Sequence, residues 1–443
     1  MRRDLRVRIG VALGVQVGLA TLLALPPAAA AETLVIDGGT VHTMAEEPFV
    51  GRVVVTDGQI VAAAADATVP AGATILDATG KHVWPGLFDA LSQVGLVEIG
   101  AVSATDDQAE LGLYNPHLGA ATAIHPASDL IPVARANGIT HSVVAPVVDR
   151  DGVIPGQASL VHLAGWTVEE MAIEPAVAMV VVWPRIATRS FDFSTFSVVE
   201  TPYEEAKKEA DKKIDELRDW FDAARHYAQA AEAGSGRLEA DLALAALARV
   251  VRGEQPLILR ADEKRDIEAA VAFAAEQGVP MVLAGGRDAW KVTELLAEKQ
   301  IPVILGFTAS LPAEEDDPYD RPFRTAGELV AAGVRVAFAS GAGGGFGPGG
   351  PHDSRTLPFE AAMAAAYGLA EDDALLALTR WAAEMHGVGD RLGTIEPGKI
   401  ANLIVTTGSP LQMTSRVEHV IIGGREVSTD NRHRRLYETY RAR

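Results

Sequence analysis

The middle of the chain alternates between short apolar runs and segments with the three-to-four spacing of helices. Each apolar run is rich in Val, Ile and Leu, as expected for parallel strands that are buried on both faces. Eight such strands over roughly 250 residues predict an α/β fold, the (β/α)8 or TIM barrel. The predicted strands are Val83–Phe88, Ile139–Ala145, Ser159–Leu163, Val177–Trp183, Leu257–Arg260, Pro280–Ala284, Pro302–Leu305 and Val334–Ala339. The clearest predicted helices between them are Asp129–Asn137, Asp266–Gln277 and Trp290–Lys299.

A long charged helix is predicted between the fourth and fifth of these strands, over Tyr203–Ala233. Small and apolar side chains repeat along it every three or four residues, so one face should pack against the protein. Its many Lys and Glu residues are then expected to form the solvated face. The predicted packed positions are Ala206, Ala210, Ile214, Leu217, Phe221, Ala224 and Ala228.

Both ends of the chain carry short strands that are broken by turns instead of helices. Near the N-terminus, Asp57-Gly58 lies between two apolar runs and is a strong hairpin signal. Similar strands recur near the C-terminus, which predicts one small β-sandwich built from both ends. The predicted boundaries are 32–84 and 391–430 for the sandwich, 85–390 for the barrel and 431–443 for a C-terminal tail.

The first residues have the composition of an export signal. Four arginines precede an apolar run, Ile9–Leu25, and two prolines and four alanines follow it. A basic head, an apolar middle and an Ala-x-Ala end are the parts of a secretory signal peptide, so we expect residues 1–31 to be removed. Cleavage after Ala31 would place the mature protein in the periplasm or outside the cell. The alternative is that the apolar run stays in place as a membrane anchor.

Charge and cysteine content narrow the classes of function. The formal net charge is −20, which disfavours nucleic acid and anionic membrane surfaces as partners. The chain has no cysteine, which excludes disulfides, thiolate metal ligands and a cysteine nucleophile. An exported protein without disulfides must draw its stability from its core.

The stretch Lys81–Gly95 holds the most informative motif, KHVWPGLFDALSQVG. It resembles the first barrel strand of the amidohydrolase superfamily, where the pattern is Pro-Gly-x-x-Asp-x-His-x-His. The Pro85-Gly86 pair and Asp89 match this pattern, but Leu91 and Gln93 stand in place of the two histidines.

A second motif, RLGTIEPGK at 391–399, resembles the segment that leads into the closing strand of the sandwich in secreted imidazolonepropionase-like members. Asn402 follows it where an Asp is usual. The resemblance covers nearly all of the mature chain. It implies the same barrel, and the same sandwich built from both termini, that the hydrophobic pattern predicts.

The resemblance also implies one or two divalent metals, zinc or another, at the C-terminal ends of the barrel strands. Such a metal activates a water for hydrolysis of C–N bonds and needs imidazole and carboxylate ligands. In this chain the corresponding positions carry side chains that cannot bind zinc, so we expect no metal cofactor. The former ligand positions are Leu91, Gln93, Arg260, Gly285 (or its neighbour Gly286) and Gly341, the last where the catalytic Asp belongs.

Four residues are expected to face the barrel mouth from strand ends: Asp89, Gln93, Arg260 and Ser340. Because Arg260 would bring a fixed positive charge into a former cation site, we expect its guanidinium to pair with the Asp89 carboxylate. The resulting interpretation is a protein that has lost its metal-binding residues and binds a small-molecule ligand. It could equally act as a subunit, in a homo-oligomer or with a catalytic relative.

The alternative is an enzyme, a hydrolase acting on C–N bonds by a metal-free or relocated-metal route. Relocated ligands would be His117, His125 and His352, which fall in predicted loops. By contrast, His141 and His162 lie within predicted strands and are expected to be core or barrel-facing residues.

The glycine-rich segment 341–350 formally satisfies G-x-G-x-x-G at Gly345, Gly347 and Gly350. A phosphate-binding loop is followed directly by a helix, and no helix is predicted to begin after this segment. We therefore expect a loop over the barrel mouth and no nucleotide site.

The expected export of the protein gives the first testable prediction. Mass spectrometry of periplasmic material should give a chain that begins at Glu32, because the signal segment is removed after Ala31. A full-length species in the inner-membrane fraction would show instead that the apolar run is kept as an anchor.

Overall fold

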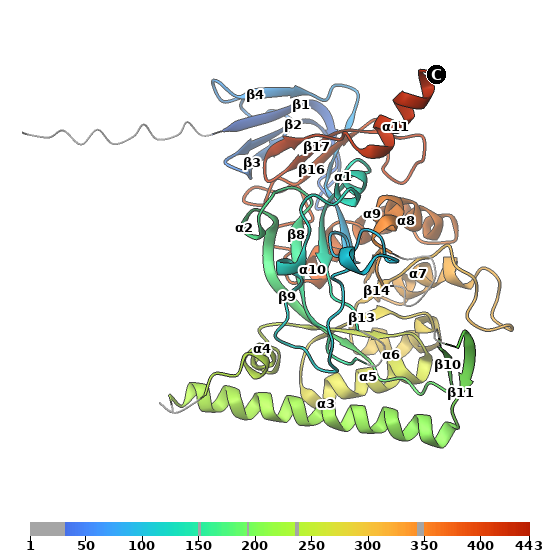
Figure 1. Cartoon of the computed structure of the whole chain (residues 1–443). Coiled ribbons are helices and arrows are strands. Elements are labelled where there is room, and N and C mark those ends of the chain that lie inside the picture. Colours follow the sequence, from blue (N-terminus) through green and yellow to red (C-terminus); the bar gives the residue numbers. More distant parts are fainter. Residues whose placement is uncertain (1–31, 149–151, 193–194, 235–238, 343–349) are drawn as a thin grey trace, which may run out of the picture. The chain divides into compact units, whose positions relative to one another are not determined.

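The computed structural model describes residues 32–148, 152–192, 195–234, 239–342 and 350–443 (Figure 1). The expected signal peptide, residues 1–31, lies outside these ranges. Within them, each helix is either too short or too polar to cross a bilayer.

Strands from both ends of the chain form one sheet. It contains β1 (Thr33–Val41), β2 (Phe49–Thr56), β3 (Gln59–Ala64), β4 (Thr74–Asp77), β5 (His82–Pro85), β16 (Leu403–Thr406), β17 (Val417–Ile422) and β18 (Arg425–Val427). The strand order is β18-β17-β16-β5-β1-β2-β3, with β4 beside β1. The sheet curls over its own apolar core, and Gly424 at one end comes close to Gly58 at the other.

The hairpin predicted at Asp57-Gly58 is confirmed. The antiparallel strands β2 and β3 pair up to Thr56 opposite Gln59, so the loop has two residues. Both loop residues have positive φ, 50° at Asp57 and 83° at Gly58, as the tight turns that fit the twist of a hairpin require.

The barrel sheet has the eight strands that the apolar runs predict. They are β6 (Leu87–Ser92), β7 (Ile139–Val144), β8 (Gly156–His162), β9 (Ala172–Val182), β12 (Leu257–Ala261), β13 (Met281–Gly285), β14 (Val303–Leu305) and β15 (Val336–Phe338). They follow one another in chain order around the sheet, which confirms the (β/α)8 type of architecture.

One strand departs from the predicted parallel arrangement, because β8 runs antiparallel to both β7 and β9. A parallel neighbour needs a crossover of a dozen or more residues, usually a helix. The connection from β8 to β9 offers only the single turn α2 (Val168–Met171), so the chain reverses direction instead.

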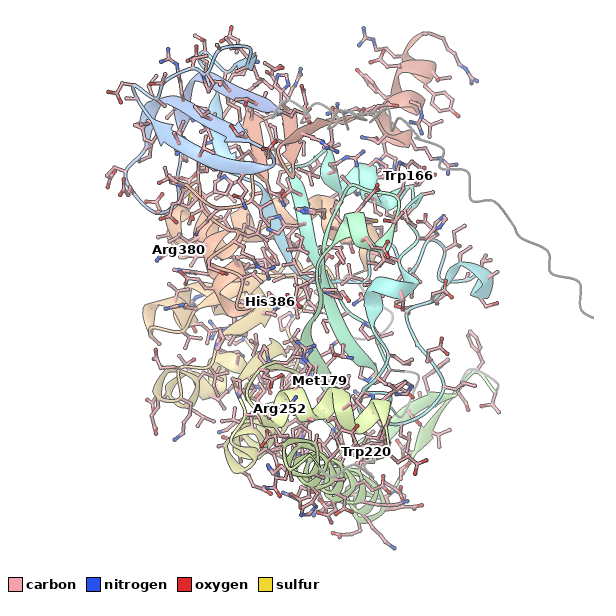
Figure 2. All side chains as sticks on the ribbon, turned by 90° about the vertical axis from the view of Figure 1, so that its left-hand side faces the viewer. Trp166, Met179, Trp220, Arg252, Arg380 and His386 are labelled. Carbon is pink, nitrogen blue, oxygen red and sulfur yellow. The ribbon has the colours of Figure 1, made fainter. Side chains whose placement is uncertain are left out.

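β6 and β15 are the two ends of the barrel sheet, and a helical segment contacts both of them at this seam. Backbone groups of β6 hydrogen-bond to the helical segment beside it: Phe88 N donates to Leu378 O at 2.8 Å, and His386 Nε2 contacts Ala90 O at 2.9 Å. This segment comprises α9 (Glu371–Ala377) and α10 (Arg380–Met385), and His386 follows directly. Figure 2 shows His386 in the interior of the molecule, and it is 2% exposed.

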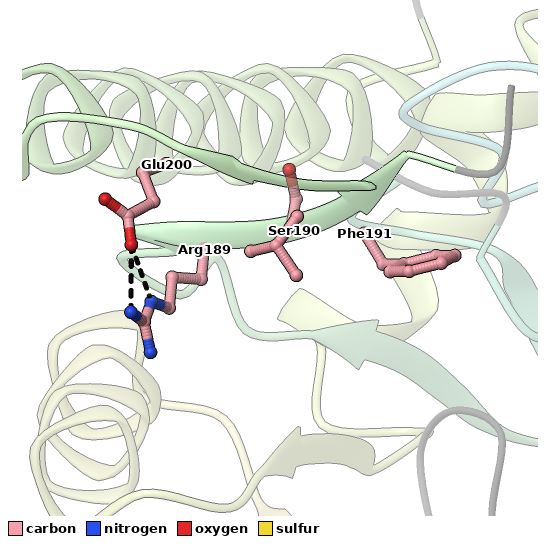
Figure 3. Close-up of a pocket in the computed structure, with 5 residues that line it drawn as sticks. Arg189, Ser190, Phe191 and Glu200 are labelled. Atoms are coloured by element: carbon pink, nitrogen blue, oxygen red, sulfur yellow. Dashed lines mark hydrogen bonds and ion pairs between the residues drawn. The ribbon is translucent and has the colours of Figure 1, made fainter. Parts of the chain in front are cut away.

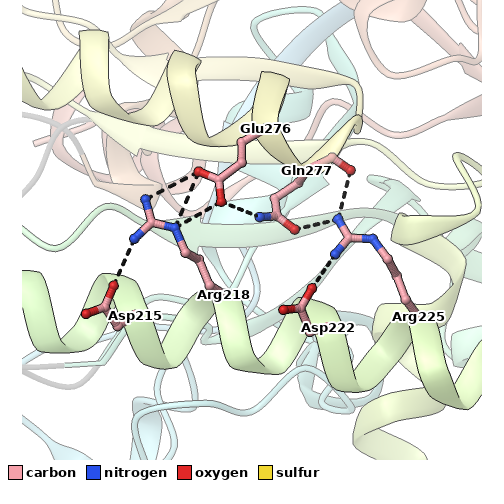
Figure 4. Close-up of polar contacts among 6 residues, drawn as sticks. All are labelled: Asp215, Arg218, Asp222, Arg225, Glu276 and Gln277. Atoms are coloured by element: carbon pink, nitrogen blue, oxygen red, sulfur yellow. Dashed lines mark hydrogen bonds and ion pairs between the residues drawn. The ribbon is translucent and has the colours of Figure 1, made fainter.

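Helices cover the barrel. They are α1 (Leu130–Arg135), α3 (Tyr203–Glu232), α4 (Leu242–Val251), α5 (Lys264–Gln277), α6 (Thr293–Glu298), α7 (Arg321–Ala331) and α8 (Leu357–Ala366). The predicted packed face of α3 is confirmed, with Leu217 and Phe221 fully buried. Its arginines also reach α5: Arg218 Nε donates to Glu276 Oε1 at 3.0 Å, and Arg225 Nη2 to Gln277 O at 3.0 Å (Figure 4).

Two elements belong neither to the barrel sheet nor to the terminal sheet. The strands β10 (Arg189–Asp192) and β11 (Ser197–Glu200) form a separate hairpin. The predicted tail contains an exposed helix, α11 (Arg432–Arg441).

The first predicted barrel strand, Val83–Phe88, is in fact two strands that belong to different sheets. β5 ends at Pro85 in the terminal sheet, and β6 begins at Leu87 in the barrel. The residue between them, Gly86, donates its N–H to Asn402 O at 2.8 Å. A Cβ on Gly86 would lie 2.1 Å from Thr140 Oγ1, so only glycine lets the chain pass from one sheet to the other here.

We expect Gly86→Ala to lower the free energy of unfolding by about 1–3 kcal/mol or more, as overpacking in a core does. The matched control is Gly100→Ala, because a Cβ on Gly100 would meet no atom within 4 Å. Urea denaturation of both variants measures the difference, and equal stabilities would contradict the steric role of Gly86.

Candidate functional site

The carboxyl group of Asp89 lies at the centre of the candidate site and is fully buried. Ser340, which follows β15, donates twice to it: its backbone N to Oδ1 at 3.0 Å and its Oγ to Oδ2 at 2.6 Å. Burial raises the pKa of Asp89 to about 6, and the hydrogen bonds from Ser340 oppose that rise. The structure thus brings together two of the four predicted mouth residues.

The placement of Asp89 differs from the prediction in one respect. It was expected at the end of its strand, but β6 continues to Ser92, so Asp89 lies within the strand. Ser142 Oγ on β7 donates to the Asp89 backbone O at 3.2 Å and is 2.8 Å from Ser92 Oγ. The hydroxyl of Ser142 therefore fixes the backbone of Asp89, while the hydroxyl of Ser340 contacts its carboxyl group.

Gln93 occupies the space beside Gly341. A Cβ on Gly341 would lie 2.6 Å from Gln93 Oε1, 2.7 Å from Gln93 Nε2 and 2.8 Å from Ser92 Cα. Gly341 N also donates to Leu91 O at 2.8 Å, which fixes its backbone against β6. The family resemblance implies a catalytic Asp at position 341. The space that its side chain would need is filled by the amide of Gln93.

The predicted pairing of Arg260 with Asp89 is wrong. Arg260 Nη2 donates to Ala342 O at 3.4 Å, while the hydrogen bonds to Asp89 come from Ser340. Burial lowers the pKa of Arg260, and the charge that opposes this shift belongs to Asp262, two residues further along. The hydroxyl and backbone N–H of Ser340 stabilise the carboxylate that Arg260 was expected to neutralise.

The surroundings of Gly285 and Leu91, two further positions where the family resemblance implies metal ligands, disfavour a metal-binding side chain. Gly285 has a φ of +90°, and a Cβ there would lie 2.6 Å from Asp262 Oδ1, so a histidine would be strained. Leu91 is fully buried in an apolar cluster with Phe88 and Val143. These side chains do not fit the divalent metal that the family resemblance implies.

The described part of the chain also lacks any group of three His, Asp or Glu side chains that could hold an ion. The structure therefore does not gather His117, His125 and His352 into a relocated site. In the glycine-rich segment, residues 343–349 lie outside the described ranges, and so does the predicted loop over the mouth.

Of the two strand histidines, His141 is buried and His162 is half-buried, and both contact the same amide. Asn402 Nδ2 lies 3.2 Å from Nδ1 of both His141 and His162. Asn402 Oδ1 accepts the Gly423 N–H at 2.9 Å, which orients the amide so that its NH₂ faces the two rings. Burial lowers the pKa of His141 to about 3 and that of His162 to about 4, so both rings are neutral.

A cavity of about 290 Å³ opens at the barrel mouth, where β12, β13 and β14 end. Its lining includes Asp262, Gly285, Thr308, Arg321 and Ala342. Asp89 and Ser340 are not part of that lining, so the cavity lies beside the buried carboxyl and does not open onto it.

A larger hollow, of about 450 Å³, lies against the β10–β11 hairpin (Figure 3). Its charged side chains already pair with each other, since Arg189 Nη2 lies 2.8 Å from Glu200 Oε1. This surface holds none of the strand-end residues, so we place the functional site at the barrel mouth.

Sequence reasoning missed three features of this region. His386 closes the seam, Ser354 lies near enough to lower the pKa of Asp89, and Arg321 lines the cavity. All three come from segments far from β6 in sequence. The only available signal was the apolar stretch that contains His386, and it does not specify a partner.

An eight-stranded barrel beside a sheet built from both chain ends defines the structural class of this protein. Residues 205–427, half of the chain, match the sequence profile of the amidohydrolase family, and the chain belongs to that family. The matched segment begins after β9, so it does not include Leu91 or Gln93.

Individual relatives agree with this assignment. The amidohydrolase tasK of Hapsidospora irregularis is 24% identical over 382 residues, which are 80% of this chain but only 37% of that protein. An amidohydrolase structure from Thermotoga maritima MSB8 is 27% identical with a TM-score of 0.73, covering 89% of this chain and 99% of that one. The structure of molinate hydrolase (17% identity, TM-score 0.54, covering 90% and 95%) shares the fold.

We expect the free energy of unfolding to fall as the pH is lowered from 7 to 4. Burial lowers the pKa of His386 to about 4 and depresses those of His141 and His162 similarly, so the unfolded chain binds protons first, below about 6.5. Each histidine therefore contributes stability above pH 6.5, and about 3 kcal/mol of it is lost by pH 4. Asp89 acts in the opposite sense, because its raised pKa stabilises the fold as the pH falls through 6, but three histidines outweigh it.

Urea denaturation at pH 7, 6, 5 and 4 measures this dependence. His386→Gln should reduce it by about one histidine's contribution, roughly 3 kcal/mol, because glutamine can still donate to Ala90 O but does not titrate in this range. The exposed His226, changed to Gln, is the control and should leave the slope unchanged. Equal stability of the unsubstituted protein at pH 7 and pH 5 would refute the argument.

Proposed function

We propose that this chain is a non-catalytic member of the amidohydrolase family that binds a small molecule at the barrel mouth. The observation that carries the proposal is the contact between Gln93 and Gly341. It places a neutral amide and a bare backbone where the family's chemistry needs an imidazole and a carboxylate.

The chemistry of the other groups supports this proposal. Hydrolysis by a metal-bound water needs ligands that hold the ion and a base that takes the proton. Leu91 and Gly285 supply no donor atoms, and Arg260 would repel a cation. Both oxygens of Asp89 already accept hydrogen bonds from Ser340.

In this role the protein is exported and recognises its ligand without turning it over. It works alone, as a homo-oligomer, or as the binding subunit of a catalytic relative. The cavity of about 290 Å³ fits a small molecule and is close to the lower end of ligand pockets, about 300 Å³.

A second candidate function is hydrolysis of C–N bonds without a metal. The observation in its favour is the Asp89–Ser340 pair, since a carboxylate with a pKa of about 6 beside a hydroxyl could act as a general base. Burial weighs against it, because Asp89 is 0% and Ser340 3% exposed, and neither lines the cavity. A substrate could not reach the pair without opening the barrel.

Metal content and turnover separate the two functions. After incubation with zinc and desalting, the mature protein should retain far less than one zinc per chain by elemental analysis. It should also show no hydrolysis of a panel of amide, urea and carbamate substrates. About one zinc per chain, lost on Gln93→Ala or Arg260→Ala, would overturn the proposal.

Restoring one expected site residue at a time provides the control. Gly341→Asp should bring back neither zinc nor turnover, because the new side chain meets Gln93 and the Ser92 backbone and because the other ligands stay absent. Turnover that survives metal chelation and is lost on Ser340→Ala would instead support the metal-free hydrolase.

A further inference from the structure

The cavity at the barrel mouth has a wall that is not part of the strand ends. The first residue of α7, Arg321, forms this wall, and its side chain is 9% exposed. The guanidinium lies over the ring of Trp290, 4.6 Å from its centroid, so the aromatic face fixes its plane.

The hydrogen-bond donors of this wall are incompletely used. Arg321 Nη2 pairs with Glu328 Oε1 at 2.5 Å, but Arg321 Nε has no acceptor among the described residues. The indole Nε1 of Trp290 is likewise buried without an acceptor there. Both groups are donors only, so what the wall lacks is an acceptor.

The charges near the cavity show which acceptor is missing. The carboxylate of Asp317 already faces the Lys291 ammonium, with 3.6 Å between Nζ and Oδ1. Asp262 Oδ1 accepts from the Arg287 backbone N at 3.4 Å, while the Arg287 side chain lies exposed at the rim. A ligand oxygen that bears negative charge would therefore meet guanidinium groups at the wall and at the rim.

Besides the hydroxyl groups of Thr308, Ser310 and Thr325, the rest of the lining is apolar or glycine. Leu305, Phe307, Leu311, Ala313, Pro322 and Ala342 surround the space between the strand ends and α7. Apolar walls with a few convergent polar groups are typical of small-molecule sites. The planar guanidinium of Arg321 matches a carboxylate, because each presents its hydrogen-bonding atoms in one plane.

We propose that this cavity binds a small monocarboxylate with an apolar body, whose carboxylate pairs with the guanidinium of Arg321. This ligand class rests on the proposed function and makes it specific. The apolar body lies against Leu305, Phe307 and Pro322.

Isothermal titration with matched probes tests the ligand class on the unsubstituted mature protein. The probes are benzoate, 3-phenylpropionate and hexanoate, each beside its primary amide, which keeps the shape and removes the charge. At least one carboxylate should bind at least ten-fold more tightly than its amide. Equal affinity within every pair, or no binding by any carboxylate, would overturn the inference.

Substitutions at and near the cavity wall test whether Arg321 contacts the carboxylate. Arg321→Gln should weaken carboxylate binding at least ten-fold and leave amide binding unchanged. Arg324→Gln, on the same helix but half-exposed and paired with Asp320 and Glu328, should change neither. Leu311→Asp should also weaken carboxylate binding, and Leu311 is 88% exposed, so this variant tests the site even if Arg321→Gln does not fold. Carboxylate affinity unchanged in Leu311→Asp would overturn the inference.

Metal content keeps this inference separate from the proposed function. If no carboxylate binds while the protein still holds no zinc and shows no turnover, the ligand class is wrong and the non-catalytic role stands. Zinc-dependent turnover would overturn the non-catalytic role, whichever probe binds.

Discussion

The two hydrogen bonds from Ser340 to Asp89 hold the barrel together at its seam. In the described sheet, β6 and β15 are the two ends of the strand order and share no ladder. The carboxyl group therefore does what a row of backbone hydrogen bonds does elsewhere in the barrel, and Gly341 N to Leu91 O adds one backbone contact. A buried carboxylate is costly unless it accepts hydrogen bonds, so the two bonds from Ser340 stabilise Asp89 in the barrel wall.

The eight barrel strands and the long α3 helix were predictable, because each carries a local pattern that reports burial. The direction of β8 was not, since it depends on how much chain is available to cross back over the sheet. The division of the first predicted strand at Gly86 was also missed. An apolar run records that residues are buried but does not say in which of two adjoining cores.

The candidate site could also be predicted only in part from the sequence. The sequence singled out Asp89 and Ser340, because both follow or lie in apolar runs, and the structure places the two side chains in contact. It paired Asp89 with the wrong residue, since charge suggested Arg260 whereas the distances favour the Ser340 hydroxyl and backbone N–H. Neither Arg321 nor Trp290 carried any motif, because their role depends on a helix and a turn that meet only in the folded chain.

The fit of Gln93 against Gly341 also bears on how this protein could change over evolutionary time. An aspartate at position 341 needs the space that Gln93 fills, and a histidine at 285 needs a backbone conformation that favours glycine. A lineage that placed metal ligands at these two positions would have to cross several less stable intermediates. Epistasis between each position and its neighbours would then act as a ratchet against that change.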